Sequence, residues 1–503
     1  MKRLTTKCLA AVLLVLGVAA CSKKDPEVVV GVQPSHEASL KYFAFSPKDN
    51  SGLRETASAI LCNGYYCVTV PEEANLTALV PAIEVSPGAA VTIDGRPYSP
   101  GTSYDFSTGI QTVQVVSESG QRTSKYQFMV KNGDLEVDRK VYAFMSDFHV
   151  PGVSISIMKG TKVVYSCGYG LANKETEERV TPDHLFRMAS ISKQFCALCV
   201  MRLVEQGRLR LDDTVFGEKG VLQGVYGFVT PYHEAITVRH LLSHSSGITK
   251  GLTDPAFNWS YRMFEGTSVP VPTDTLIQRT LKARPQPYND GSQDWGPGVA
   301  FNYSNIGYCI LHRVVEVVSG KSYENFLKED LLEPMGITDT HIGGYLSERR
   351  PNECVYYSQD GADGYSNCLP QLAGAAGVIT STNQLMKLLT YIDMDDEVPD
   401  SFSRETLEEM YMPYQYSGSG TYGSNYHRYG LGWRINHSVL FEGAHYHGGD
   451  IAGTATLWAG RTYSGMSGAF VCNSRAYNSN ASGSMDDNLY VLLDGFMKHF
   501  QAK

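Results

Sequence analysis

The chain has 503 residues, of which 43% are hydrophobic and 19% charged, a composition typical of a folded globular protein. Its length exceeds what one hydrophobic core usually organises, so we expect at least two domains. The formal net charge is −9 at pH 7, and no cluster of basic residues follows the extreme N-terminus, which argues against a nucleic-acid partner.

The first residues have the pattern of an export signal. Lys2, Arg3 and Lys7 precede an apolar run over residues 9–16, and small residues then lead directly into Cys21. The apolar run is too short to span a bilayer as a mature helix. The pattern therefore predicts a cleaved signal peptide.

Small residues followed by a cysteine resemble the cleavage site of bacterial lipoproteins. This resemblance implies a signal peptide over residues 1–20, lipidation of Cys21, and a solvated tether over residues 21–37. An ordinary signal peptide cut after Ala20 is the alternative. We expect an exported protein that contacts the membrane only through its lipid anchor. It would lie in the periplasm or at the cell surface, with the outer membrane as the expected membrane.

Short strands and turns follow over residues 38–132. Turn dipeptides such as Asn63-Gly64 separate runs of β-branched and aromatic residues, a pattern that predicts a small β-sandwich. It resembles the immunoglobulin-like modules of exported bacterial enzymes, which implies a spacer or docking role; carbohydrate binding is the alternative. The predicted strands are Lys41–Phe45, Tyr66–Val70, Ile83–Val85, Ala90–Ile93, Gln111–Val116 and Tyr126–Val130.

The apolar period becomes helical near Asp134 and indicates a second domain over residues 134–503. A helical stripe over residues 137–148 is followed by a hairpin that turns at Lys159-Gly160, and the middle of the domain is helical. We predict an α+β fold in which an antiparallel sheet, built from both ends of the domain, is flanked by helices. The late elements are strands at Leu440-Phe441, Ala455–Trp458 and Gly468–Cys472 and a helix at Met485–Phe500.

Ser190 and Lys193 open a helical run with the spacing Ser-x-x-Lys. Residues three apart on a helix lie on one face, so the hydroxyl and the amine would be neighbours. An uncharged lysine could then accept the serine proton and activate the oxygen as a nucleophile. Cys196 and Cys199, on the same helix, fall at core positions, and we interpret them as buried packing residues.

Two further motifs follow in order, Tyr303-Ser304-Asn305 and His447-Gly448-Gly449. Together with Ser-x-x-Lys they resemble the serine β-lactamase and penicillin-binding-protein superfamily, in its class C and esterase-like branch. The resemblance implies a β-lactamase-like catalytic domain with no cofactor or metal. Matching context is found in Val238–Gly247, Leu331–Thr340, Ala375–Thr382 and Tyr429–Trp433.

The resemblance also implies roles for the motif residues. Ser190 would carry the acyl group, Lys193 would act as the base, and Tyr303 would pass a proton to the leaving group. Asn305 would fix Lys193 and bind the acyl side chain of the substrate. Tyr303 to Asn305 could also simply begin a helix, with Asn305 as its cap.

The third motif would form the other wall of the site. The family's oxyanion hole uses two backbone N–H groups, which here belong to Ser190 and Asp450. Gly448 and Gly449 would line the bound substrate, and His447 would take the catalytic position of the motif's first residue. His240 and His244, by contrast, are expected to brace a loop.

One difference from the family's motif pattern limits the substrates that we expect. Members that recognise penicillin carry Lys-Thr-Gly at the third motif, whereas this chain has His447-Gly448 and lacks that cation. We therefore expect cleavage of an ester or amide in a small-molecule or peptide acyl substrate, with penicillins turned over poorly. Aromatic-rich inserts at residues 250–297 and 345–365 indicate either a bulky apolar substrate or a lid, or simply packing on their own domain.

Two alternatives remain for the chemistry. The acyl group could pass to a bulky alcohol instead of water, or the protein could bind cell-wall peptides or β-lactams as a sensor without hydrolysis. The intact motifs favour an enzyme.

Overall fold

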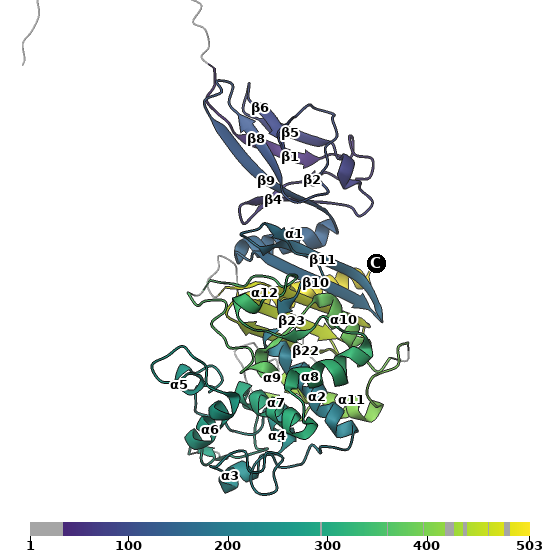
Figure 1. Ribbon diagram of the computed structural model, residues 1–503. Helices are drawn as coiled ribbons and strands as arrows, with labels where there is room; N and C mark the ends of the chain where they lie inside the picture. Colours follow the sequence, from purple (N-terminus) through teal and green to yellow (C-terminus); the bar gives the residue numbers. More distant parts are fainter. Residues whose placement is uncertain are drawn as a thin grey trace, which may run out of the picture.

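The computed structural model describes residues 34–503 apart from 292–293, 360, 396, 418–426, 436–439, 461 and 477–482. The predicted signal peptide, Cys21 and most of the predicted tether therefore lie outside the described residues. Within those described, no helix has the length and apolar character needed to cross a bilayer. A small N-terminal β region sits at one end of a larger α+β domain (Figure 1).

In the described part of the N-terminal region, strands form a three-stranded sheet in the order β2-β1-β5 and a six-stranded sheet in the order β3-β4-β9-β8-β6-β7. Their core is aromatic: Phe43 packs on Phe128 with ring centroids 4.0 Å apart. All six predicted strands are confirmed. The strands are β1 (Leu40–Phe45), β2 (Ala57–Ser58), β3 (Ile60–Cys62), β4 (Tyr65–Val70), β5 (Pro81–Val85), β6 (Ala90–Ile93), β7 (Arg96–Pro97), β8 (Gln111–Val116) and β9 (Thr123–Asn132).

The α+β domain is built on an antiparallel sheet with the order β12-β11-β10-β24-β23-β22-β21-β20-β19 among the described residues. The hairpin β10-β11 near the start of the domain pairs with β24 near its end, so the predicted joining of both chain ends is confirmed. The predicted strand at Leu440-Phe441 is wrong, because these residues form a bend. The strands are β10 (Gly152–Lys159), β11 (Lys162–Asn173), β12 (Glu178–Arg179), β19 (Gln415–Ser417), β20 (His427–Tyr429), β21 (Arg434–Ile435), β22 (His445–Ile451), β23 (Thr454–Gly460) and β24 (Met466–Cys472).

The two faces of this sheet are covered differently. Val153, Ile155 and Ile157 of β10 belong to an apolar core shared with α1 (Leu135–Asp147) and α12 (Met485–Gln501). The alternating Ser154 and Ser156 face the other side, where their hydroxyls lie 2.8 and 2.9 Å from the hydroxyl of Thr382 in α10 (Thr382–Leu389). The strand's period of two thus separates an apolar face from a hydrogen-bonded one.

A helical region covers that second face and contains the first two motifs, whereas the third lies on strand β22 of the sheet. Its central helix is α2 (Ser192–Glu205), which packs against α7 (Asn305–Ser319) and α9 (Ala373–Ala376). Cys196 and Cys199 of α2 are fully buried, which confirms their interpretation as core residues. The other helices named here are α3 (Pro231–Glu234), α4 (Val238–Leu242), α5 (Trp259–Arg262), α6 (Thr273–Ala283), α8 (Tyr323–Asn325) and α11 (Arg404–Tyr411).

The β region and the α+β domain meet through a buried polar network centred on Asp138 of α1. Its carboxylate accepts hydrogen bonds from Thr69 of β4 at 2.6 Å and from Tyr165 and Tyr169 of β11 at 2.8 and 2.5 Å. Lys131 of β9 completes the network with an ion pair to Asp138 at 2.8 Å. The β region is therefore docked on the domain rather than only tethered to it.

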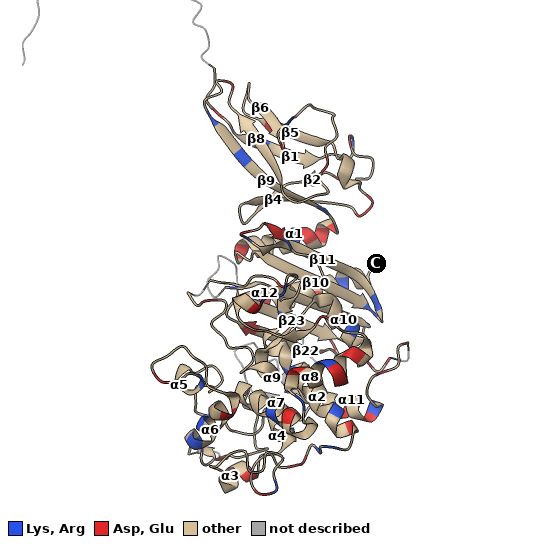
Figure 2. Cartoon of the chain, viewed as in Figure 1, with Lys and Arg blue, Asp and Glu red and all other residues tan. Residues whose placement is uncertain are grey.

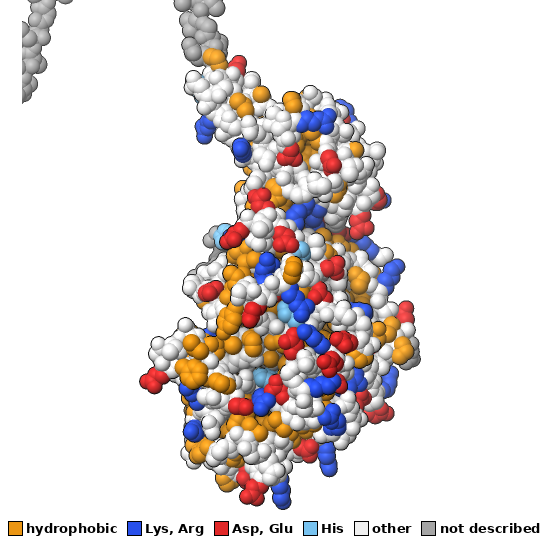
Figure 3. Space-filling model, viewed as in Figure 1, with side chains coloured by type: hydrophobic (Ala, Val, Ile, Leu, Met, Phe, Trp, Pro, Cys, Tyr) orange, Lys and Arg blue, Asp and Glu red, His pale blue; other side chains and the backbone are white. Residues whose placement is uncertain are grey.

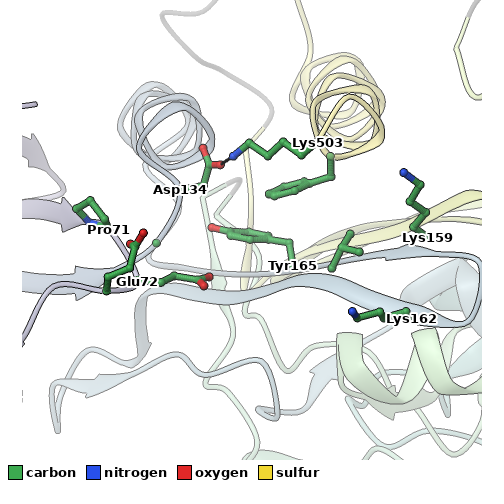
Figure 4. Close-up of a pocket in the computed structure, with 11 residues that line it drawn as sticks. Pro71, Glu72, Asp134, Lys159, Lys162, Tyr165 and Lys503 are labelled. Carbon is green, nitrogen blue, oxygen red and sulfur yellow. Dashed lines mark hydrogen bonds and ion pairs between the residues drawn. The ribbon is translucent and has the colours of Figure 1, made fainter. Parts of the chain in front are cut away.

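A cavity of about 690 Å³ also lies at this junction. Figure 4 shows Asp134 paired with Lys503 above Tyr165, with Glu72 on one side and Lys159 and Lys162 on the other. Its described lining residues include no serine, cysteine or histidine.

Charged side chains are dispersed over the molecule. Figure 2 shows lysine, arginine and acidic residues scattered along helices and loops of both parts, and on the face in Figure 3 the two signs alternate. The face shown carries no continuous basic stripe of the kind that binds nucleic acid.

Candidate active site

Ser190 lies in a single 3-10 turn, Ala189–Ile191, immediately before α2. Ala189 has φ +46°, a left-handed conformation that is uncommon for a residue with a Cβ. The preceding Met188 is held on both sides: its N–H donates to the Val378 carbonyl at 2.9 Å, and its carbonyl accepts from the Thr456 hydroxyl at 3.0 Å. This fixed, strained turn presents Ser190 beside strands β22 and β23 of the sheet.

Lys193 is fully buried, and its amine is surrounded by three acceptors. The Nζ atom lies 3.0 Å from Ser190 Oγ, 2.8 Å from Asn305 Oδ1 and 2.9 Å from the carbonyl of Ala375. A neutral amine has two N–H donors and one lone pair. In that neutral form, donation to Asn305 and Ala375 would leave the lone pair for the Ser190 hydroxyl, as a base requires, whereas the charged ammonium donates to all three acceptors.

Asn305 is the first residue of α7 and is oriented by Asp254. The Asp254 carboxylate accepts from the Asn305 backbone N–H at 2.6 Å, from its side-chain amide at 3.2 Å, and from the Ile306 N–H at 3.3 Å. With its Nδ2 held by Asp254, Asn305 turns Oδ1 towards Lys193. The motif begins α7, as one interpretation predicted, but the predicted cap is wrong: Ser304, not Asn305, is the N-cap, and Asn305 instead contacts Lys193.

Tyr303 places its ring between Lys193 and His244. Lys193 Nζ is 4.8 Å from the Tyr303 ring centroid, and the His244 ring is 4.3 Å from it on another side. His244 also accepts the Ser304 backbone N–H on Nδ1 at 3.0 Å. His244 therefore has the expected bracing role, because it holds the segment that carries Tyr303. His240, in turn, caps its own helix α4.

A chain of hydrogen bonds runs from His244 to the third motif. Since His244 Nδ1 accepts, its Nε2 donates to the Tyr429 hydroxyl at 3.2 Å, and that hydroxyl donates to His447 Nε2 at 3.1 Å. His447 Nδ1 then donates to the carbonyl of Gly448. This order assigns one tautomer to each imidazole.

Burial keeps this chain uncharged. It holds the pKa of His244 and of His447 well below the usual range, and nearby Arg434 and Lys193 lower both further. It also raises the pKa of Tyr429 well above its usual value. His447 is only 1% exposed and both its nitrogens are engaged, so it offers no cation to a substrate carboxylate.

Gly449 brings strand β22 against the nucleophile. A Cβ at this position would lie 2.5 Å from Thr456 Oγ1, 2.6 Å from the Met188 carbonyl and 2.8 Å from Ser190 N. A side chain here would therefore push β22 away from Ser190. Ser190 and Asp450, whose N–H groups are the predicted oxyanion hole, both line one cleft, whereas Gly448 faces Tyr490 of α12.

The cleft has a volume of about 420 Å³ and is lined by four predicted site residues and by Arg475, which the sequence did not indicate. Asp450 forms an ion pair with Arg475 of β25 (Ser474–Arg475) on its wall. His447 and Lys193 lie behind the surface that lines it. The lining residues are Ser190, Phe257, Tyr303, Asn305, Ala362, Ser366, Asn367, Asp450, Ile451, Ala452 and Arg475.

Both aromatic inserts reach this cleft. Arg262 in the first donates to Asn367 at 3.0 Å, and Arg187 holds the second with its guanidinium carbon 4.2 and 4.5 Å from the ring centroids of Tyr356 and Tyr365. These tyrosines pack on their own domain, whereas Trp259 of the first insert is 52% exposed.

Sequence reasoning did not identify Asp254, Tyr429 or Arg475 as parts of the site. Tyr429 begins the family-like segment Tyr429–Trp433, but nothing in that segment indicates its hydrogen bond to His447. The described residues contain no group of three histidine, cysteine or acidic side chains arranged to hold a metal ion.

Comparisons with known proteins agree with this architecture. The Beta-lactamase family profile matches residues 137–488. Protein flp of Staphylococcus aureus (strain N315) is 25% identical over 236 residues, which cover 46% of this chain and 43% of that protein. The chain therefore spans less than half the length of that relative.

Solved structures also resemble this chain in fold. A penicillin-binding protein homologue from Pyrococcus abyssi superposes with a TM-score of 0.55 at 26% identity, covering 73% of this chain and 77% of that one. A D-stereospecific amidohydrolase from a Streptomyces species superposes with a TM-score of 0.52 at 26% identity, covering 68% and 95%. The predicted α+β fold is thus confirmed.

Proposed function

Because the chain belongs to the β-lactamase family, we propose that it is a serine hydrolase that cleaves an ester or amide through an acyl-enzyme on Ser190. The observation that carries this proposal is the position of Lys193, whose buried amine contacts Ser190, Asn305 and Ala375 together. Lys193 thus lies directly behind Ser190 and Asn305, which line the cleft.

The proposed first half-reaction uses the motif residues in the roles that the family resemblance implies. In its neutral form, Lys193 would take the proton from the Ser190 hydroxyl as Oγ attacks the substrate carbonyl, so a C–O bond forms and the carbonyl π electrons move to oxygen. The N–H groups of Ser190 and Asp450 bind that oxyanion. Collapse of the intermediate expels the alcohol or amine, which takes a proton from the Tyr303 hydroxyl, and Tyr303 recovers one from Lys193. Water then releases the acyl group by the reverse sequence.

We propose a neutral ester or amide as the preferred substrate. His447 is buried and uncharged where β-lactam-recognising relatives have a lysine, and the cleft's arginine is already paired with Asp450. The likeness to a D-stereospecific amidohydrolase adds D-amino-acid amides to the substrates worth testing. An anionic β-lactam would lack the charge-assisted contact that other members supply.

The test is kcat/KM on one preparation for p-nitrophenyl esters, D-aminoacyl amides and nitrocefin, with Ser190→Ala as the control. We expect esters or amides to exceed nitrocefin by about 100-fold, comparable to one charge-assisted contact. Nitrocefin turnover equal to or above that of the esters would contradict this substrate assignment. Turnover unchanged in Ser190→Ala would contradict the mechanism.

We further propose export and lipid anchoring through Cys21. The support is the order of basic, apolar and small residues that ends at this cysteine. Cys21→Ala should release the protein from the membrane fraction while its activity is kept. Membrane retention of that variant would refute the anchor.

A further inference from the structure

We propose that Arg475 is a positioning residue that keeps the oxyanion hole usable by neutralising the carboxylate of Asp450. This inference rests on the proposed acyl-enzyme function and adds to it a requirement that no sequence motif contains. Arg475 would act through Asp450 and touch no reacting atom.

Asp450 carries two groups with opposite effects on the oxyanion: a backbone N–H that would stabilise it and a carboxylate that would repel it. The backbone N–H of Asp450 is placed to stabilise the negative charge that develops on the substrate oxygen. Asp450 lines the cleft, and its own carboxylate, whose side chain is 32% exposed, lies at the same end of β22 on the side of α12. Like charges near one another repel, and the repulsion is strong where little water screens it.

Arg475 offsets the negative charge of the Asp450 carboxylate. Its Nη1 pairs with Asp450 Oδ1, and the Arg475 side chain is only 13% exposed. It follows β24 in the chain and is held on β25, which pairs in parallel with β17 (Tyr357–Ser358). The guanidinium is therefore part of the fold and does not depend on a substrate to bring it into position.

Other acidic residues near the ion pair increase the need for the positive charge of Arg475. Asp486 and Asp487 lie in the first turn of α12 near the pair, and burial followed by the charges of Asp450 and Asp487 raises the pKa of Asp486 to about 6. Arg475 and Arg434 act in the opposite direction on the same group. Loss of Arg475 would leave this end of the cleft with an excess of negative charge beside the oxyanion.

The test is a double-mutant cycle between Arg475→Met and Asp450→Asn, measured as kcat and KM on a neutral p-nitrophenyl ester. With Asp450 present, Arg475→Met should lower kcat roughly tenfold or more, as expected for an uncompensated charge in a partly screened site. In the Asp450→Asn background, the same change should lower kcat less than about threefold. Arg475→Lys, which keeps the charge, should stay within a few fold of wild type and also covers the case in which Arg475→Met folds poorly.

Two results would overturn the proposal. An equal loss in both backgrounds would mean that Arg475 supports the fold instead of neutralising Asp450. A rise in KM confined to anionic substrates would mean that Arg475 binds a substrate carboxylate. Arg350→Met, which breaks an ion pair with Asp339 away from the cleft, is the matched control and should keep full activity.

These failures differ from failure of the proposed function. If turnover persists in Ser190→Ala, the acyl-enzyme assignment itself is wrong. If turnover requires Ser190 but the cycle shows no coupling, only the role of Arg475 is refuted.

Discussion

At the scale of single residues, the site is defined by what each polar atom already contacts. Lys193 has two acceptors for its N–H groups and a third partner in Ser190, so its environment fits a base. His447, by contrast, has both nitrogens engaged inside the protein and cannot take the role of a lysine in binding an anion. The same motif position thus carries different chemistry from that of the penicillin-recognising relatives.

Lys193 and Tyr303 should act as one unit. Lys193→Met and Tyr303→Phe should each lower kcat by at least about 100-fold, because one removes the base and the other the proton donor to the leaving group. The double variant should be little worse than the poorer single one. Kinetics on a p-nitrophenyl ester measure this, and fully multiplicative losses would show that the two residues do not share a proton.

His312 should make stability depend on pH. It is buried in α7, and burial lowers its pKa to about 4 from the usual 6.5. Between these values the unfolded chain binds a proton that the folded protein excludes. The stabilisation is therefore complete above pH 6.5 and is lost as the pH falls towards 4, by up to about 3 kcal/mol.

Thermal unfolding from pH 7 to pH 4 tests this expectation. The fall in Tm should be shallower in His312→Gln than in wild type, even though that variant begins less stable. His36→Gln, at an exposed histidine, should follow the wild-type slope. Parallel curves for His312→Gln and wild type would show that this residue does not titrate as the burial implies.

At the scale of elements, most of the architecture could be predicted from local patterns. The hairpin β10-β11, the strands of the β region and the terminal helix α12 appear where alternation and helical periodicity place them. Leu440-Phe441 was predicted as a strand because both residues are apolar, yet Phe441 is buried as part of a bend. A short apolar run alone does not separate these cases.

The candidate site was partly predictable for a similar reason. Ser190, Lys193, Tyr303 and Asn305 lie in short motifs whose spacing can be recognised, and the structure brings them together. Asp254 and Arg475 have no such spacing, because their partners Asn305 and Asp450 are brought to them only by folding. Their roles depend on tertiary contacts that no local pattern encodes.

Gly449→Ala tests how closely β22 must approach Ser190. The added Cβ would lie 2.6 Å from the Met188 carbonyl and 2.8 Å from Ser190 N, so the strand would shift and widen the oxyanion hole. We expect kcat to fall by about 100-fold or more. Gly495→Ala in α12, where a Cβ meets no atom within 4 Å, should keep wild-type kcat. Equal activities of the two variants would show that this close approach is not needed.

At the scale of the whole molecule, the N-terminal β region, for which the sequence indicates a spacer or docking role, contacts the α+β domain through buried polar groups. Thr69 and Lys131 from this region reach the carboxylate of Asp138 in α1, the helix that packs beneath the catalytic sheet. A truncation before residue 133 would remove both partners and leave that buried carboxylate to Tyr165 and Tyr169. We therefore expect the isolated domain to be less stable than the full chain.

Lys131→Met isolates that contact without a truncation. It leaves Asp138 buried without its cation, which should lower the free energy of unfolding by about 3 kcal/mol. Lys140→Met, which breaks an exposed pair with Glu136 on the same helix, should cost less than about 1 kcal/mol. Chemical denaturation of both variants measures the difference, and equal losses would mean that the junction contributes little.

The central claim is that Ser190 carries the acyl group, and covalent trapping tests it most directly. The full-length protein is treated with a fluorophosphonate, digested, and analysed by peptide mass spectrometry, with Ser190→Ala treated in parallel. The account predicts one modified peptide, with the added mass on Ser190, and no labelling of the variant. Labelling at another residue, or equal labelling of Ser190→Ala, would contradict it.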